Sequence, residues 1–116
     1  MRHGNKNKTL DRLKAPREAM LRNLAASILT YEKVKTTSAK AKAVKPLVER
    51  LITTAKKGDL NAHRALLKTI YQKPVVKKTL DVLAERYKTR AGGYTRIIKI
   101  GPRQGDGAQI VQIELV

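Results

Sequence analysis

The apolar side chains between residues 41 and 55 follow one face of a helix, and they constrain the fold more than any other segment. They recur three and four residues apart, at Ala41, Val44, Leu47, Val48, Leu51, Ile52 and Ala55. This spacing predicts an amphipathic helix over residues 38–57, capped by Ser38, with its apolar stripe in a core. Pro46 removes one backbone donor inside it, so we expect a kink or break near residues 42–45.

Three other segments also have apolar residues at helical spacing. They predict helices over residues 16–30, 59–72 and 74–87. Pro16 and Pro74 suit the first positions of two of these helices, Glu18 complements the first helix dipole, and Asp59 can cap the third helix after Gly58 ends the second.

Three segments have the β-branched, alternating pattern of strands: 31–37, 94–100 and 109–116. In the first, Lys33 and Lys35 share one face. The last two flank GPRQGDGA, whose proline and three glycines predict a turn and an antiparallel hairpin. The order helix, strand, three helices, two strands predicts an α+β fold of two layers, with helices packed on a small three-stranded mixed sheet that ends in a C-terminal hairpin.

The N-terminal residues 1–15 differ from the rest in being basic and poor in apolar side chains. We interpret them as an extended arm that becomes ordered on RNA, attached to a single globular domain at residues 16–116. The alternative is a frayed terminus without function.

The charge of the chain indicates a polyanionic partner. Twenty-six Lys and Arg oppose nine Asp and Glu, a formal charge of +17. Such self-repulsion destabilises a compact state, so nucleic acid is the first expectation and an anionic membrane the second. No apolar run approaches 18 residues, which excludes a membrane-spanning helix. Helix 38–57 could instead bind a membrane surface through its apolar stripe, but a domain of this size needs that stripe for its core.

The residues for catalysis or metal binding are largely missing. The chain has no cysteine, and its two histidines, His3 and His63, lack partners at metal or triad spacing. Gly92 and Gly93 follow a predicted helix and open a strand, the reverse of a phosphate loop. We therefore expect no enzyme, no cofactor, no metal and no small-molecule substrate.

A DNA-binding regulator is the main rival among nucleic-acid binders. Helices 59–72 and 74–87 are joined by a short turn, as in a helix-turn-helix, but the second opens with Pro74 and two valines. Its lysines, Lys77 and Lys78, are balanced by Asp81 and Glu85. The sequence predicts no sheet with a set of exposed aromatic residues that could stack single-stranded bases.

The distribution of basic residues favours a protein that binds the phosphate backbone of a folded RNA over a DNA-binding regulator. Arg90, Arg96, Lys99 and Arg103 are predicted to cluster at the glycine break and hairpin, with only Asp106 nearby, while the arm adds charge at the other end of the chain.

Several segments along the whole chain resemble the bacterial large-subunit ribosomal protein seventeen family. They are MRHG at 1–4, RNLAASIL at 22–29, KTTSAKAKAV at 35–44, LITTAKKGD at 51–59, RAGGYTRI at 90–97 and IELV at 113–116. The resemblance implies a non-enzymatic, cytoplasmic constituent of the large ribosomal subunit, bound to large-subunit ribosomal RNA and to neighbouring large-subunit ribosomal proteins, near the outer opening of the exit tunnel. Asp11 and Pro16 depart from the family pattern.

The candidate RNA contacts have two sources. Matching positions in the family give Arg2, His3, Arg12, Arg17, Arg22, Arg90, Tyr94 and Arg96. Charge and the glycine break add Lys6, Lys8, Lys14, Lys33, Lys35, Lys40, Gly92, Gly93, Lys99 and Arg103. The alternative function is that of a basic DNA-binding or nucleoid-associated protein.

Overall fold

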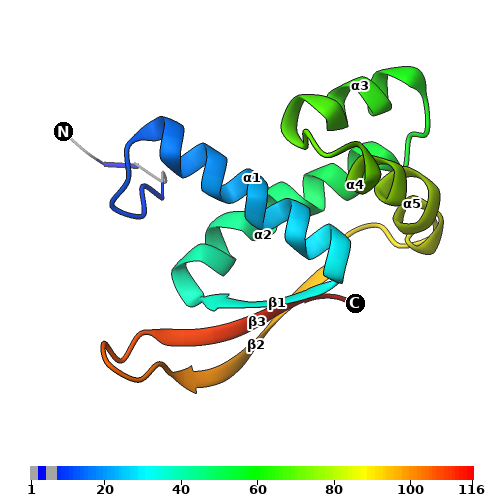
Figure 1. Cartoon of the computed structure of the whole chain (residues 1–116). Coiled ribbons are helices and arrows are strands. Elements are labelled where there is room, and N and C mark those ends of the chain that lie inside the picture. Colours follow the sequence, from blue (N-terminus) through cyan, green and yellow to red (C-terminus); the bar gives the residue numbers. More distant parts are fainter. Residues whose placement is uncertain (1–2, 5–7) are drawn as a thin grey trace.

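The computed structural model describes residues 3–4 and 8–116. Arg2 and Lys6, two of the candidate contacts, lie outside the described residues. The observed order of elements confirms the α+β class: α1 (Lys14–Tyr31), β1 (Lys33–Thr37), α2 (Ser38–Ala55), α3 (Leu60–Thr69), α4 (Lys73–Lys78), the π-helical turn η1 (Thr79–Leu83), α5 (Ala84–Arg86), β2 (Thr95–Pro102) and β3 (Gln109–Leu115). The helices lie on one side of the sheet (Figure 1).

The sheet has the order β1-β3-β2, and both pairings are antiparallel. The predicted C-terminal hairpin is confirmed, but the prediction of a mixed sheet is wrong. β1 and β2 run in the same direction, yet β3 lies between them, so they never pair with each other. The register aligns Val34, Ile113 and Ile97 on one face of the sheet.

The core lies between that face and the helices. Val111 and Ile113 of β3 join the buried stripe of α2, including Val44, Val48 and Ile52, in one apolar cluster. Because side chains alternate along a strand, Lys33, Lys35 and Arg96 point to the opposite face, which none of the helices in the described part of the chain covers (Figure 1).

The ends of the helices differ in detail from the predictions. α1 begins at Lys14, so Pro16 is its third residue and Glu18 lies beyond the first turn. α2 runs unbroken through Pro46, so a break there is not found, and its N-cap is Thr37 rather than Ser38. The Asp59 cap is confirmed, because its Oδ1 accepts from the Ala62 amide at 2.7 Å.

The segment predicted as one helix over 74–87 contains a π-helical turn between α4 and α5. Thr79 opens this turn and is fully buried. Its hydroxyl donates to the Val75 carbonyl oxygen at 2.8 Å, which satisfies the only polar atom of the side chain.

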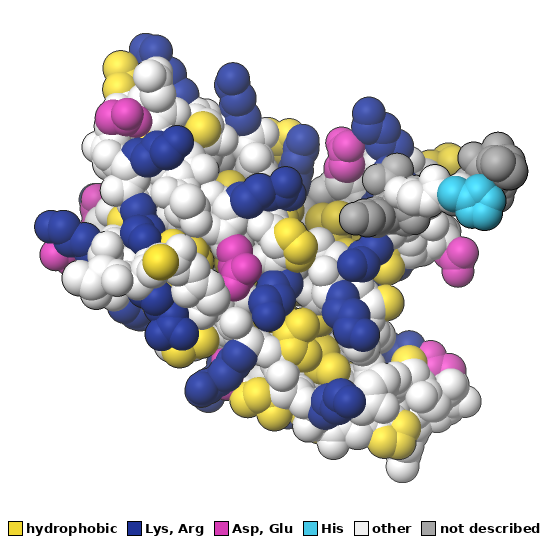
Figure 2. All heavy atoms as spheres, turned by 180° about the vertical axis from the view of Figure 1, so that it is seen from behind, with side chains coloured by type: hydrophobic (Ala, Val, Ile, Leu, Met, Phe, Trp, Pro, Cys, Tyr) yellow, Lys and Arg dark blue, Asp and Glu magenta, His cyan; other side chains and the backbone are white. Residues whose placement is uncertain are grey.

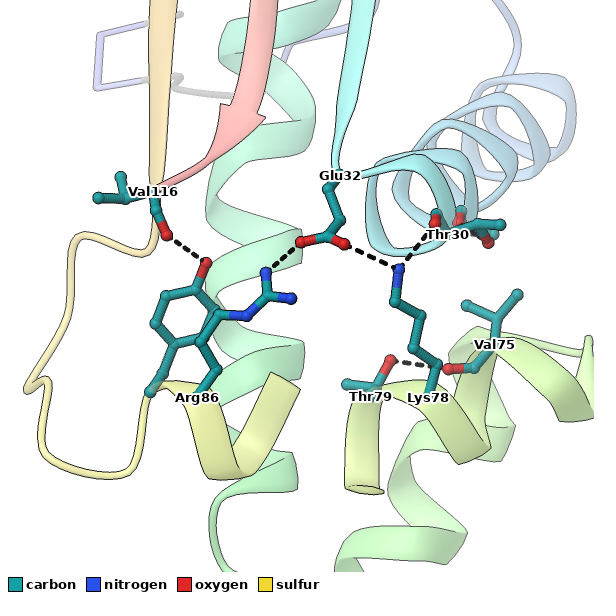
Figure 3. A network of polar contacts seen from close by, with 9 residues as sticks. Thr30, Glu32, Val75, Lys78, Thr79, Arg86 and Val116 are labelled. Carbon is teal, nitrogen blue, oxygen red and sulfur yellow. Dashed lines mark hydrogen bonds and ion pairs between the residues drawn. The ribbon is translucent and has the colours of Figure 1, made fainter. Parts of the chain in front are cut away.

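A polar network fastens this segment to the end of α1 (Figure 3). Glu32, the C-cap residue of α1, accepts hydrogen bonds from Arg86 and, at 3.3 Å, from Lys78. Lys78 also donates to the Thr30 carbonyl oxygen at 2.7 Å. Lys78 is therefore held by Glu32, not balanced by Asp81 or Glu85 as predicted.

Among the described residues, no helix is both long and apolar enough to cross a membrane.

Candidate nucleic-acid interface

The basic residues around the hairpin do not form one cluster, so that prediction is wrong. Arg90 precedes β2 and Arg103 follows it, and the eight residues of β2 span about 26 Å at about 3.3 Å each. The glycine break and the hairpin turn consequently lie at opposite ends of the sheet, on the right and left of Figure 1.

The glycine break is built as a braced turn. The Nε of Arg90 donates to the carbonyl oxygens of Gly92 at 3.1 Å and Gly93 at 3.2 Å. Gly93 has a φ of +63°, a conformation that favours glycine. Lys56, near the end of α2, donates to the Arg90 carbonyl oxygen at 2.5 Å. One edge of the Arg90 guanidinium thus holds the loop, while the residue itself remains exposed.

Tyr94 belongs to the core rather than to the surface. Its side chain is 1% exposed, and its ring centroid lies 5.1 Å from that of Tyr87. Hydrogen bonds from Thr53 and from Lys56, the latter at 3.0 Å, lower the pKa of Tyr94 from its ordinary value. In this position the ring cannot stack on a base, and Tyr94 instead fixes the loop that carries Arg90.

Two arginines of the hairpin have carboxylate partners. Arg96 donates to Glu114 at 2.7 Å across the paired strands, and this hydrogen bond lowers the pKa of Glu114. Arg103 donates to Asp106 through Nε at 3.1 Å and Nη2 at 2.5 Å, which holds the pKa of Asp106 well below its usual range. Asp106 is close to Arg103 in sequence and could be predicted as its neighbour, whereas Glu114 could not, because only the strand register places it opposite Arg96.

A second basic region, which we call the basic end, joins parts of the chain distant in sequence. It comprises Lys8 of the arm together with Lys40 and Lys42 near the start of α2. Lys8 and Lys42 border one pocket of about 460 Å³ beside the first turn of α2. The hairpin turn lies close to that helix end. Thr37, which precedes α2, pairs with Ile110 of β3, and the turn begins where Pro102 pairs with Gln109.

The basic end suits phosphate groups. The first amides of an 18-residue helix have no partners within the helix and carry its positive dipole end, and α2 has no side-chain cap. Lys40 and Lys42 add charge there. Lys42 is not among the contacts predicted from the sequence, because only the tertiary structure brings it to the arm.

The remaining candidates are dispersed. Arg22 on α1 contacts Tyr71, and Arg17 donates to the Arg12 carbonyl oxygen at 3.4 Å. Exposed side chains without such a role are those of His3, Lys14, Lys33, Lys35 and Lys99. Seen from behind, Lys and Arg side chains are distributed over the left and centre of the visible face, with fewer acidic groups among them (Figure 2). Within residues 3–4 and 8–116, no three His, Asp or Glu side chains gather as a metal site.

Comparison with known proteins gives a consistent result. The sequence model of the family "Ribosomal protein L17" matches residues 20–116. Over all 116 residues the chain is 48% identical to large ribosomal subunit protein bL17 of Agrobacterium fabrum, covering 82% of that protein, and 50% identical to its namesake in Trichlorobacter lovleyi, covering 94%. It is 55% identical over 100 residues, 86% of the chain and 89% of the relative, to bL17 of Caldanaerobacter subterraneus subsp. tengcongensis.

Proposed function

The chain belongs to the ribosomal protein L17 family, and from this premise we propose that it is a structural constituent of the large ribosomal subunit that binds and stabilises large-subunit ribosomal RNA. It works in the cytoplasm beside neighbouring large-subunit proteins, and its role is architectural and not catalytic.

The observation that carries this proposal is the separation of two basic regions that lie beside opposite ends of the sheet. β2 alone, whose eight residues span about 26 Å, separates the glycine break with Arg90 from the hairpin turn beside the basic end. Phosphates of two different RNA segments can occupy these regions at once, so the protein holds the segments at a fixed distance. Recognition of this kind depends on the shape of a folded RNA more than on its sequence.

The alternative of a DNA-binding protein has less support. The would-be recognition helix, α4, has six residues before the π-helical turn. Its Lys78 is engaged by Glu32 and Thr30, and Pro74 occupies its first turn. These features leave few side chains for reading base edges.

The test is competitive binding of the full chain to large-subunit ribosomal RNA, small-subunit ribosomal RNA and duplex DNA at physiological salt. We expect the large-subunit RNA to bind at least about tenfold more tightly than the others, and the protein to sediment with large subunits. Lys40→Gln with Lys42→Gln should weaken binding more than the matched pair Lys77→Gln with Lys88→Gln. Equal affinity for all three nucleic acids would contradict the proposal.

A further inference from the structure

The four tyrosines of the chain fall into two classes. Tyr87 and Tyr94 are buried against each other in the core. Tyr71 is 67% exposed, and Tyr31 is 72% exposed. An exposed aromatic face on a highly basic protein is a surface on which a nucleobase can stack, because every base has a π face.

Tyr71 is exposed but held in place. Its neighbour Ile70, at the end of α3, is 1% exposed and anchors the loop in the core. Arg22 of α1 donates a hydrogen bond to the Tyr71 hydroxyl, and its guanidinium carbon lies 5.4 Å from the ring centroid. The ring is therefore fixed against α1 before any ligand arrives, which reduces the entropy lost on binding.

The surface beside this ring has the polarity of a base-binding site. A pocket of about 310 Å³ lies between α1 and the loop, lined in part by Glu18, Asn23, Gln72 and Tyr71. Its two side-chain amides can donate to and accept from the edge of a base. The carboxylate of Glu18 repels a phosphate but accepts from an amino group, as acidic side chains do from cytosine.

We propose that Tyr71 and Arg22 form a stacking site for one unpaired base of the large-subunit RNA, whose amino-bearing edge enters the pocket toward Glu18. This inference rests on the proposed function and adds a base-specific contact to its phosphate contacts. Lys68 and Lys73, both exposed, flank the loop in sequence and suit the phosphates on either side of such a nucleotide.

The experiment is chemical footprinting of protein-free large-subunit ribosomal RNA, with reagents that modify the Watson–Crick edges of unpaired bases. The natural chain should protect one unpaired guanine, adenine or cytosine, and this protection should depend on the Tyr71 ring. Tyr71→Phe keeps the ring but loses the hydroxyl that accepts from Arg22, so it should keep most of the protection. Tyr71→Leu should lose the protection and weaken affinity by about tenfold, the usual scale for one stacked base. Arg22→Gln should weaken the protection in the same place.

Two controls separate stacking from other effects. Leu60→Ala truncates a side chain that is 62% exposed elsewhere on the surface, and it should leave the footprint unchanged. The slope of log affinity against log salt should be the same for Tyr71→Leu as for the natural chain, because the substitution leaves every phosphate contact in place. Circular dichroism verifies that each variant is folded.

The outcomes distinguish this inference from the proposed function. If the natural chain leaves no footprint at all, RNA binding itself is refuted. If it leaves a footprint that Tyr71→Leu does not alter, the stacking site is wrong while RNA binding stands. Loss of subunit incorporation by Tyr71→Leu with an unchanged footprint would assign the ring to a neighbouring protein, and would also overturn the proposal.

Discussion

Glu32 occupies a backbone conformation that ordinarily favours glycine. It ends α1 with a φ of +67°, and its amide donates to the Ile28 carbonyl oxygen at 2.8 Å. A non-glycine residue in this region is strained, and glycine is the usual residue there. Glutamate at this position is explained by its side chain, which accepts hydrogen bonds from both Arg86 and Lys78 (Figure 3).

Replacing Glu32 with Gln should make stability less dependent on pH. The hydrogen bond from Arg86, and then that from Lys78, lower the pKa of Glu32 from its ordinary value of 4.5. Because the folded pKa is the lower one, the stabilisation is complete above the unfolded pKa and is lost as pH falls through the folded pKa. We expect a loss of about 1 kcal/mol at pH 7, small because the carboxylate is partly exposed and screened by solvent, and a diminishing loss below pH 4.5.

Urea titrations of both proteins from pH 7 to pH 3 measure this difference. Glu85→Gln is the matched control, since it removes the same charge from α5, where no ion pair to Glu85 is found within the described residues. An equal loss of stability in the two variants would show that net charge, and not the network, is responsible.

At the same scale, Arg90 and Arg96 should matter more for subunit assembly than surface lysines. Arg90→Gln with Arg96→Gln should reduce incorporation into large subunits by about tenfold or more in competition with the natural chain, because paired guanidinium contacts to phosphate cannot be replaced by glutamine. Lys77→Gln with Lys88→Gln should have a small effect. Lys78 is unsuitable as a control, because its charge holds Glu32.

Equal incorporation of the two double variants would indicate binding by charge alone. Circular dichroism is needed here as well, since Arg90 also braces the glycine break and Arg96 pairs with Glu114.

At the scale of the element, α2 is the central helix of the core although it contains a proline. Six of its residues are buried, and they pack with β3 and α1 in one cluster. Pro46 is exposed, so its ring contributes little to that packing. Tertiary burial therefore outweighs the local cost of a proline inside the helix.

Pro46→Ala should stabilise the protein by about 2 kcal/mol. Alanine restores the missing backbone donor and removes the clash in the preceding turn, worth about 3 kcal/mol, offset by about 1 kcal/mol of gained freedom in the unfolded chain. The free energy of unfolding in urea measures this. Pro74→Ala, in the first turn of α4 where proline is tolerated, should change stability by only a few tenths of a kcal/mol. A Pro46→Ala variant that is no more stable than the natural chain would mean that the helix already accommodates the ring without strain.

At the scale of the whole molecule, the charge is distributed over separated regions, so affinity for RNA should depend on salt through several phosphate groups at once. Removing residues 1–9 deletes Arg2, Lys6 and Lys8 from the arm. The slope of log affinity against log salt should become less steep by about 2 to 3, because each phosphate that the arm neutralises accounts for about 0.7 to 0.9 of the slope. Filter binding over a range of salt concentrations measures the slope.

The fold should survive this deletion, because α1 begins only at Lys14. An unchanged slope would show that the arm makes no phosphate contacts. The Lys77→Gln and Lys88→Gln pair serves again as the comparison for loss of charge elsewhere.

The sequence by itself predicted the helices and strands and indicated a polyanionic partner. Apolar spacing located α2 within two residues at its C-terminal end, alternation separated Lys33 and Lys35 from the core face of β1, and a proline with three glycines identified the hairpin. These are local properties, because the periods of helices and strands depend only on residues that are close together in sequence. The charge of +17 needed no structure to indicate a polyanion.

Only the tertiary structure decided which charges lie together and which are already engaged. Strand order made the sheet antiparallel, and register gave Arg96 its partner Glu114. Packing buried Tyr94 and left Tyr71 exposed beside Arg22. These relations join residues far apart in sequence, and no local pattern encodes them, because pairing across elements depends on how apolar faces pack together.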